Sequence, residues 1–391
     1  MSRSRDELRI LCHPSTHAAG THPSEPPADA RGPAAPAAGS AVGVLRVAAR
    51  ILLVALLIRG VLAAPVASAE QAAVWSAIEV AGHSVAPGET VRFPVDPAQT
   101  IGGEDCMLET LVVVTRGVRP GPTLCLTAGI HGDEMNSIEV AHRIYAGTPG
   151  SALAGTLIAL PVVNVSGVRS GQRYLPDRRD LNRAFPGSPK GSLASRIAHS
   201  LYQGVIRHCD ALIDLHTGSS SRTNLPQIRT DLESPPALAL ARSFGVGVVL
   251  NGRGPRGSLR RAVLDGGVPA VIYEAGEPLR FQEEEIARGV EGVQNVMAHL
   301  GMIARAAKRQ SSVAYRKTSW VRAGAGFGVF MTPRQPGDEV RKGDVLGTVT
   351  NPFTEASVAI VAPRDGRIIG MAVPQWALPG YGLFHLGFDP E

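Results

Sequence analysis

The sequence predicts an α/β protein with a mostly parallel or mixed sheet flanked by helices, followed by a small all-β, barrel-like C-terminal domain. Between about residues 108 and 274, short apolar runs alternate with stretches of helical periodicity, which is typical of strands joined by crossover helices. After about residue 313 the chain changes to short strands, glycines and turns, with no helical pattern. These two observations define the fold class.

The apolar runs and the helical stretches can be placed on the chain. We expect strands at residues 108–117, 123–130, 155–164, 211–216, 245–251 and 269–274. We expect helices at residues 136–147, 192–209, 235–245 and 281–303. Such a sheet is covered on both faces, and its functional sites lie outside the carboxyl ends of its strands.

The C-terminal region contains two similar halves, at residues 324–353 and 356–387. Each half begins with a strand, continues through a Pro-Gly or Asp-Gly turn, and closes with another strand, which predicts internal pseudo-symmetry. The segment GDEVRKGDVLG (337–347) resembles half-motifs of biotinyl and lipoyl carriers. Those carriers present a lysine between the halves. Because residues 351–356 contain no lysine, we expect no covalently carried cofactor.

Composition and charge exclude several classes of protein. The 391 residues are 44% hydrophobic and 19% charged, enough for about two or three domains with a large core. This composition excludes disordered, collagen-like, disulfide-scaffold and polytopic membrane proteins. The net charge is +5, of which residues 1–69 account for +3, and no aromatic residues are interleaved with the arginine clusters. We therefore expect no nucleic-acid partner.

Residues 1–69 are predicted to be a disordered leader plus a signal peptide, in front of domains at residues 70–312 and 313–391. Two arginines precede a short apolar run, and small residues then lead to Ala69, which is the order of a secretory signal cleaved after that residue. The mature chain is expected to be periplasmic or secreted. The alternative is an uncleaved leader, which would then be the chain's membrane contact.

Three cysteines remain after the leader: Cys106, Cys125 and Cys209. An odd number without a C-x-x-C pair argues against a cysteine metal site or a disulfide framework. We expect three buried, unpaired side chains. A Cys106–Cys125 disulfide is the alternative in an oxidising compartment.

The segment GIHGDE (129–134) predicts a metal site. It follows a predicted strand and precedes a predicted helix, so that His131 and Glu134 can converge on one point. A second strand ends at His216, which places this imidazole at the same edge of the sheet. Two imidazoles and one carboxylate with an open fourth position are the ligands of a catalytic zinc, which activates water and polarises a carbonyl. We expect one Zn²⁺ per chain.

Further polar residues are expected around this metal. Glu274 ends another predicted strand and is the candidate general base, with Glu277 as the alternative. A buried Asn182-Arg183 pair offers donors for a substrate carboxylate, and Arg173 is a further candidate contact. Asp180 could accept the free ring N–H of His131 and fix its tautomer.

Four motifs together resemble the succinylglutamate desuccinylase/aspartoacylase family: GIHGDEMNSIEVAHRI, RYLPDRRDLNRAFPGS, LIDLHTGSSSRTNLPQIR and AVIYEAGEP. The resemblance covers about residues 108–303 and implies a zinc carboxypeptidase-like fold. It implies the same zinc ligands, base and substrate contacts, and a C-terminal β domain that narrows access to the site. It adds a substrate arginine upstream of Glu274, for which Arg260 is favoured over Arg261.

These observations predict a zinc-dependent hydrolase that cleaves an amide bond of an N-acyl amino acid or a related small carboxylate. The alternatives are a carboxypeptidase-like peptidase acting on short or cell-wall peptides, and a non-catalytic binding protein built on the same fold. Another divalent ion could occupy the same ligands, because affinity alone does not select zinc. The sequence predicts no particular oligomeric state.

Overall fold

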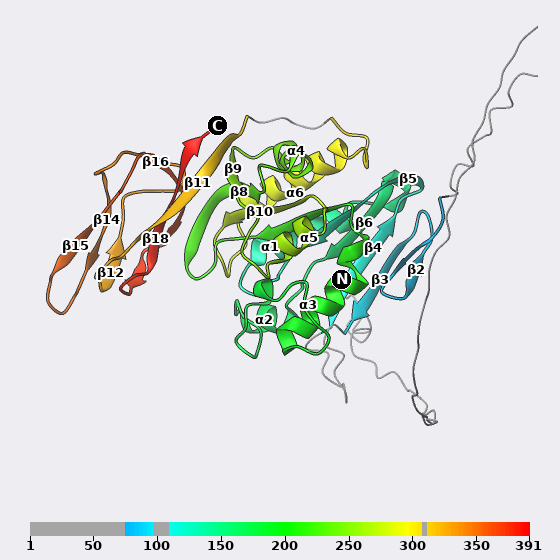
Figure 1. Cartoon of the computed structure of the whole chain (residues 1–391), viewed down its shortest axis with the longest axis horizontal. Helices are drawn as coiled ribbons and strands as arrows, with labels where there is room; N and C mark the ends of the chain where they lie inside the picture. Colours follow the sequence, from blue (N-terminus) through cyan, green and yellow to red (C-terminus); the bar gives the residue numbers. More distant parts are fainter. Residues whose placement is uncertain (1–74, 97–108, 307–310) are drawn as a thin grey trace, which may run out of the picture. The chain divides into compact units, whose positions relative to one another are not determined.

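The computed structural model describes residues 75–96, 109–306 and 311–391, with elements labelled as in Figure 1. The strands are β1 (Ile78–Val80), β2 (His83–Val85), β3 (Thr90–Val95), β4 (Thr110–Arg116), β5 (Arg119–Thr127), β6 (Ala154–Leu160), β7 (Ala211–His216), β8 (Arg222–Thr230), β9 (Val248–Asn251), β10 (Ala270–Gly276), β11 (Val313–Arg322), β12 (Gly328–Met331), β13 (Glu339–Val340), β14 (Val345–Thr350), β15 (Ser357–Val361), β16 (Gly366–Ala372), β17 (Gln375–Ala377) and β18 (Gly382–Pro390). The helices are α1 (Met135–Ala146), α2 (Val165–Ser170), α3 (Leu193–Gly204), α4 (Pro235–Phe244), α5 (Leu259–Asp265) and α6 (Glu283–His299), with short 3-10 turns η1 (Gly150–Ala152), η2 (Leu181–Arg183) and η3 (Ile206–His208).

One mixed sheet of 12 strands organises the chain, in the order β13-β16-β18-β11-β9-β8-β10-β7-β5-β6-β4-β3. The strands β10, β7, β5 and β6 run parallel to one another at its centre. The strand β8 is antiparallel to β10, and β4 is antiparallel to β6. The mixed α/β prediction is therefore confirmed, and the parallel centre brings several strand ends to one edge.

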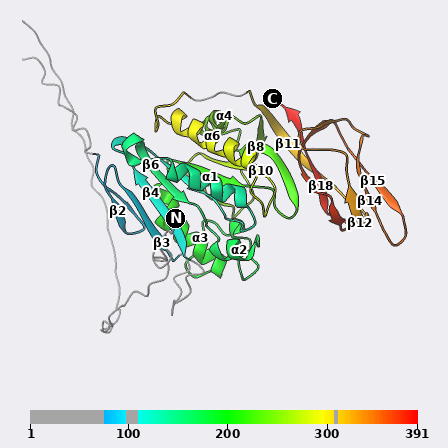
Figure 2. The ribbon, with the colours of Figure 1, turned by 180° about the vertical axis from the view of Figure 1, so that it is seen from behind.

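Helices cover both faces of the central strands, as Figure 2 shows from behind. On one face, Ile144 of α1, Phe244 of α4 and Val296 of α6 share an apolar cluster with Leu124 and Leu126 of β5. On the other face, α3 and α5 pack in a second cluster. Because both faces are buried, the polar residues of these strands can meet a ligand only at the strand ends.

The C-terminal region is built of strands, as predicted: from Val313 onward every element of the described chain is a strand. Four of these strands extend the large sheet, where β11 runs parallel to β9 and β16 pairs antiparallel with β8. The other four form a separate sheet in the order β15-β14-β12-β17. The large sheet therefore contains strands from both sides of the predicted domain boundary between residues 312 and 313. The domain boundary itself stays a prediction.

Two strands of the large sheet, β3 and β8, were not expected. Residues 222–230 form β8, although Asn224, Pro226 and two arginines interrupt any apolar run there. The strand forms because β8 pairs with β10 and β9 on its two sides, so that neighbouring strands rather than sequence pattern decide its conformation. The predicted leader, residues 1–69, lies outside the described residues. Within the described part of the chain, no helix combines the length and hydropathy needed to cross a bilayer.

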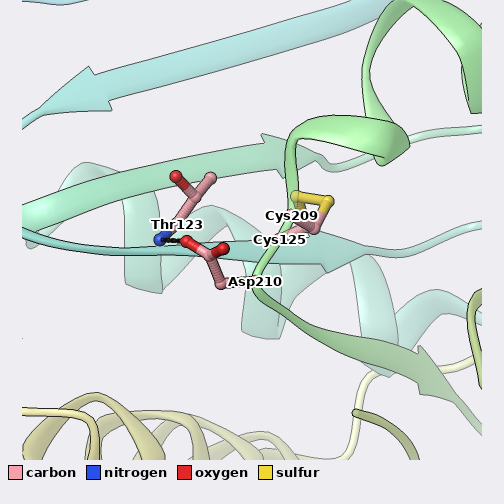
Figure 3. Close-up of a disulfide and its surroundings, with 4 residues drawn as sticks. All are labelled: Thr123, Cys125, Cys209 and Asp210. Carbon is pink, nitrogen blue, oxygen red and sulfur yellow. Dashed lines mark hydrogen bonds between the residues drawn. A yellow bond between two sulfur atoms is a disulfide. The ribbon is translucent and has the colours of Figure 1, made fainter. Parts of the chain in front are cut away.

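The prediction of unpaired cysteines is wrong, and so is the alternative Cys106–Cys125 pair. Cys125 of β5 forms a disulfide with Cys209, two residues before β7 (Figure 3). The two strands are parallel neighbours, with Cys125 opposite Leu212, which brings the two Cα atoms to 5.6 Å. The sequence could not show this pairing, because it depends on the order of the strands in the sheet. The expected burial of both side chains is confirmed.

This disulfide is expected to stabilise the fold substantially. It joins residues 84 apart in sequence, and closing a loop of that length in the unfolded chain corresponds to about 3–5 kcal/mol. We expect the Cys125→Ala/Cys209→Ala variant to lose about that much free energy of unfolding in urea titrations. Cys106→Ala, which leaves the disulfide intact, is the control. The expectation fails if the double variant is as stable as the oxidised wild-type protein.

Candidate metal centre and catalytic site

Three parallel strands end at the predicted site. His131 follows β5, His216 is the last residue of β7, and Glu274 lies opposite His216 in the register of β10 with β7. Glu134 is the N-cap residue of α1, which begins one residue later. The strand-to-helix turn predicted from GIHGDE is therefore present, and the parallel register brings its side chains next to those of β7.

A close backbone contact explains the glycine that follows His131. A Cβ atom on Gly132 would lie 1.9 Å from the carbonyl carbon of Gly167 in α2, a separation that no packed structure tolerates. Only glycine fits, and its amide N–H donates to the carbonyl oxygen of Gln172. The turn that carries His131 is thus held against α2 by the backbone itself.

The three predicted ligands form one buried cluster. Nδ1 of His131 lies 2.8 Å from Oε1 of Glu134, and Nδ1 of His216 lies 2.7 Å from Oε2 of the same carboxylate. One donor atom from each residue falls within 4.8 Å of the others. Two imidazole nitrogens and a carboxylate oxygen, buried and mutually close, match the donor set of a catalytic zinc site.

Charge coupling within the cluster is strong. Burial alone would lower the pKa of His131, but the carboxylates of Glu134 and Asp180 outweigh it and raise that pKa. Likewise, burial is outweighed at His216 by Asp214 and Glu134, which raise its pKa well above the ordinary value. The two imidazoles in turn outweigh burial at Glu134 and hold its pKa well below the usual range. The buried carboxylate therefore requires positive charge beside it.

A second carboxylate stands behind each imidazole. Oδ1 of Asp180 lies 3.2 Å from Nε2 of His131, the contact expected from the sequence. Asp214 was not predicted: its Oδ2 lies 2.9 Å from Nε2 of His216, and its Oδ1 accepts a hydrogen bond from Thr127. With both Nε2 atoms occupied, the Nδ1 atoms remain for a metal, which is the usual arrangement behind zinc-binding histidines.

Glu274 is held by two donors of β8. Nη1 of Arg229 lies 3.1 Å from its Oε1, and Nδ2 of Asn224 donates to its Oε2 at 2.5 Å. Neither donor was predicted, because their approach depends on the antiparallel pairing of β8 with β10. The only signal in the sequence is a polar segment, RTNLPQIR, directly after the His216 motif.

One cavity of about 470 Å³ brings the predicted residues together. Its lining includes all nine of them: His131, Glu134, Arg173, Asp180, Asn182, Arg183, His216, Arg260 and Glu274. Trp320 of β11 also lines the cavity, so the C-terminal region contributes to its wall.

Arginines dominate the charge of this cavity. Arg173 donates to Asp180 at 2.9 Å and to the hydroxyl of Ser219 at 2.8 Å. Arg183 is half exposed and lies 3.9 Å from Asp180. Arg260 is buried, and its Nε and Nη1 atoms have no hydrogen-bond partner among the described residues. Burial, and then the nearby Arg229, lower the pKa of Arg260 to about 10, so it remains a cation at neutral pH.

The alternatives considered from the sequence lie elsewhere. Glu277 is paired with Arg280 at 3.2 Å and is not among the residues that line the cavity. Arg261, the competitor of Arg260, is paired with Asp265 at 2.7 Å and also lies outside the lining. Asn182 is buried, and its Oδ1 accepts from the backbone N–H of Leu259 at the start of α5.

Comparison with known families identifies the central part of the chain. Residues 120–300 match the model of the succinylglutamate desuccinylase/aspartoacylase catalytic domain. A curated relative, N-alpha-acetyl-L-2,4-diaminobutyric acid deacetylase from Halomonas elongata, is 28% identical over 221 residues. The alignment covers 54% of this chain and spans 64% of that relative's length.

Solved structures share the fold. A succinylglutamate desuccinylase/aspartoacylase from Rhodobacter sphaeroides superimposes with a TM-score of 0.66 at 26% identity, covering 72% of this chain and 90% of that one. A succinylglutamate desuccinylase from Silicibacter sp. TM1040 gives a TM-score of 0.69 at 24% identity, covering 76% of this chain and 94% of that one. The second likeness supports the fold alone.

The carboxylate behind His216 provides a test of the metal centre. The Asp214→Asn variant loses the negative charge beside Nε2 of His216 and keeps one acceptor oxygen for the two groups, Thr127 and His216, that contact the carboxylate. The His216 ring is then fixed less well, and we expect zinc affinity to fall about 10- to 100-fold. Competition with a chromophoric chelator measures this affinity. Asp210→Asn is the matched control, because Asp210 lies just before the same strand and accepts from the backbone N–H of Thr123. Equal zinc affinity in the Asp214→Asn variant and the wild-type protein would contradict the assignment.

Proposed function

The chain belongs to the succinylglutamate desuccinylase/aspartoacylase family through residues 120–300, and on that premise we propose that it is a zinc-dependent amidohydrolase of N-acyl amino acids. The observation that carries the proposal is one cavity lined by a His-Glu-His cluster, the Glu274 carboxylate and arginine donors that have no hydrogen-bond partner among the described residues. The deacetylase relative acts on an N-acetylated amino acid, which supports the same reaction class here. The proposed architecture is the zinc carboxypeptidase-like fold.

The metal would be held by His131, Glu134 and His216. The cluster fits a zinc ion because it is buried, its donors are close together, and each imidazole has its second nitrogen paired with a carboxylate. When bound, zinc would lower the pKa of water and polarise the carbonyl of the scissile amide. Asp180 and Asp214 keep the Nδ1 atoms of the two imidazoles directed at the cluster.

Glu274 is the proposed general base. Its carboxylate takes a proton from the attacking water, so that the oxygen forms a bond to the amide carbonyl carbon. The same carboxyl group then delivers that proton to the nitrogen of the leaving amino acid as the carbon–nitrogen bond breaks. Two hydrogen-bond donors, Arg229 and Asn224, orient the Glu274 carboxylate for the first of these steps.

The arginines are the proposed contacts of the substrate carboxylate. Arg260 is buried in the cavity wall, and two of its nitrogen atoms have no hydrogen-bond partner among the described residues. A substrate carboxylate would supply the partner that this buried cation lacks. Asn182 has its oxygen committed to Leu259, which leaves its amide N–H₂ group for the substrate. Arg183 and Arg173 supply further positive charge.

We propose that the protein works outside the cytoplasm. The predicted signal peptide with cleavage after Ala69 is one argument. The Cys125–Cys209 disulfide is an independent one, because such bonds persist mainly in oxidising compartments.

Loss of the base tests the proposed reaction. We expect Glu274→Gln to reduce kcat for N-acyl amino acids by about 10²- to 10⁴-fold, because the amide cannot accept the proton of water. Zinc content should stay at one ion per chain. A panel of N-acetyl and N-succinyl amino acids, dipeptides and muropeptides gives the measurement. Glu277→Gln, three residues away and outside the cavity, is the control and should keep wild-type rates.

The panel also separates the alternatives. Turnover of dipeptides or muropeptides in preference to N-acyl amino acids would replace the deacylase with a peptidase. If the purified protein bound no zinc, or if the Glu274→Gln variant functioned as well as the wild-type protein, the chain would instead be a non-catalytic binding protein.

The role of Arg260 makes a separate prediction. We expect Arg260→Gln to raise KM about 10- to 100-fold, because one charge-assisted contact to the substrate carboxylate is lost. Substrates whose carboxylate is replaced by a carboxamide should bind poorly to wild-type protein, and the variant should discriminate little between the two. Arg261→Gln is the matched control. If Arg260→Gln lowered turnover of acid and amide substrates equally, the carboxylate contact would be ruled out.

A further inference from the structure

Both carboxylate oxygens of Glu274 are held from one strand. Arg229 and Asn224 belong to β8, and they contact Oε1 and Oε2 respectively. In the antiparallel register, Arg229 lies opposite Ile272 and Asn224 lies opposite Gly276, so the two donors stand on either side of Glu274. The register of this pairing shifts between Glu274 and Gly276, and irregularities of this kind re-aim side chains next to functional sites.

Asn224 is itself held in place by the C-terminal region. It lies opposite Gly370 of β16, which pairs antiparallel with β8. A Cβ atom on Gly370 would lie 2.5 Å from Oδ1 of Asn224, so the absence of a side chain there creates the space that the amide occupies. The neighbouring Gln227 donates to the backbone oxygen of Ile369 at 2.8 Å, which ties the same two strands together.

We propose that the C-terminal β region positions the general base, through the contact of Gly370 with Asn224 and the hydrogen bond of Asn224 to Glu274. Asn224 and Gly370 are positioning residues, whereas Glu274 is the residue that reacts. The inference rests on the proposed function, because it assigns a role to the base of that reaction. It also gives residues 313–391 a part in catalysis besides lining the cavity.

The chemistry of a carboxylate makes this arrangement productive. An ionised carboxylate has about four acceptor positions on its two oxygens. Arg229 and Asn224 use one on each oxygen, which leaves a position free for the proton of water. A general base must also lie within hydrogen-bond reach of that proton, and a misplacement of about 1 Å can cost about 10²-fold in rate. Loss of the Asn224 donor therefore acts on turnover rather than on substrate affinity.

A double-mutant cycle tests the route through Asn224. We expect Asn224→Ala and Gly370→Ala each to lower kcat about 10- to 100-fold, with KM changed less than about threefold. Gly370 does not adopt a positive φ, so its backbone accepts alanine without strain. Because the added methyl group acts by displacing Asn224, Gly370→Ala should have no further effect on kcat in the Asn224→Ala variant.

Two controls exclude a general loss of structure. Met371→Leu changes the next residue of β16, which pairs with Thr223, and should keep wild-type kcat. Zinc content and melting temperature, measured on every variant, show whether the fold and the metal centre persist. Additive losses of kcat in the double variant would overturn the proposal, and so would a loss that appears only as zinc depletion.

Crystal structures of the two single variants give a readout independent of activity. We expect the Glu274 carboxylate to rotate or to occupy several conformers once Asn224 is lost or displaced. An unchanged Glu274 in both variants would overturn the inference. If the wild-type protein hydrolysed no N-acyl amino acid, the proposed function would fail, and these structures alone would decide whether β16 positions Glu274.

Discussion

The structure depends on one buried carboxylate between two imidazoles. Glu134 is 1% exposed, and removing its charge from water costs several kcal/mol unless positive charge or hydrogen-bond donors replace the lost hydration. His131 and His216 contact one oxygen each, and Ser219 donates a further hydrogen bond. The same three side chains could hold a divalent cation, which would supply the positive charge that Glu134 requires. A stable fold and a metal centre therefore both require positive charge beside the Glu134 carboxylate.

The order and direction of the strands in the large sheet bring the groups of the site together. Strands β5, β7 and β10 run parallel, so the residues at their ends reach one edge, and the disulfide joins β5 to the chain just before β7. The antiparallel β8 then brings Arg229 and Asn224 to Glu274, and β16 backs β8 from the other side. Catalytic and C-terminal strands share one sheet, which explains how residues far apart in sequence can build a single cavity.

Much of the site was predictable because it follows from rules of parallel sheets. His131, Glu134, His216 and Glu274 each sit beside the end of an apolar run, and strand ends in such sheets meet at one edge. The unpredicted features depend on pairings that the sequence leaves open. The Cys125–Cys209 bond requires β5 to be the neighbour of β7, and the contacts of Asn224 require a strand that lacks an apolar pattern. The role of Asp214 could have been predicted, because an acidic side chain within a buried strand needs a polar partner.

The central claim is that one zinc ion is held between these three side chains. Anomalous diffraction from crystals grown without added metal, measured on both sides of the zinc absorption edge, tests it most directly. The account predicts one strong anomalous peak per chain, bounded by Nδ1 of His131, the Glu134 carboxylate and Nδ1 of His216. A cluster without a zinc peak, in crystals of protein that hydrolyses N-acyl amino acids, would contradict it.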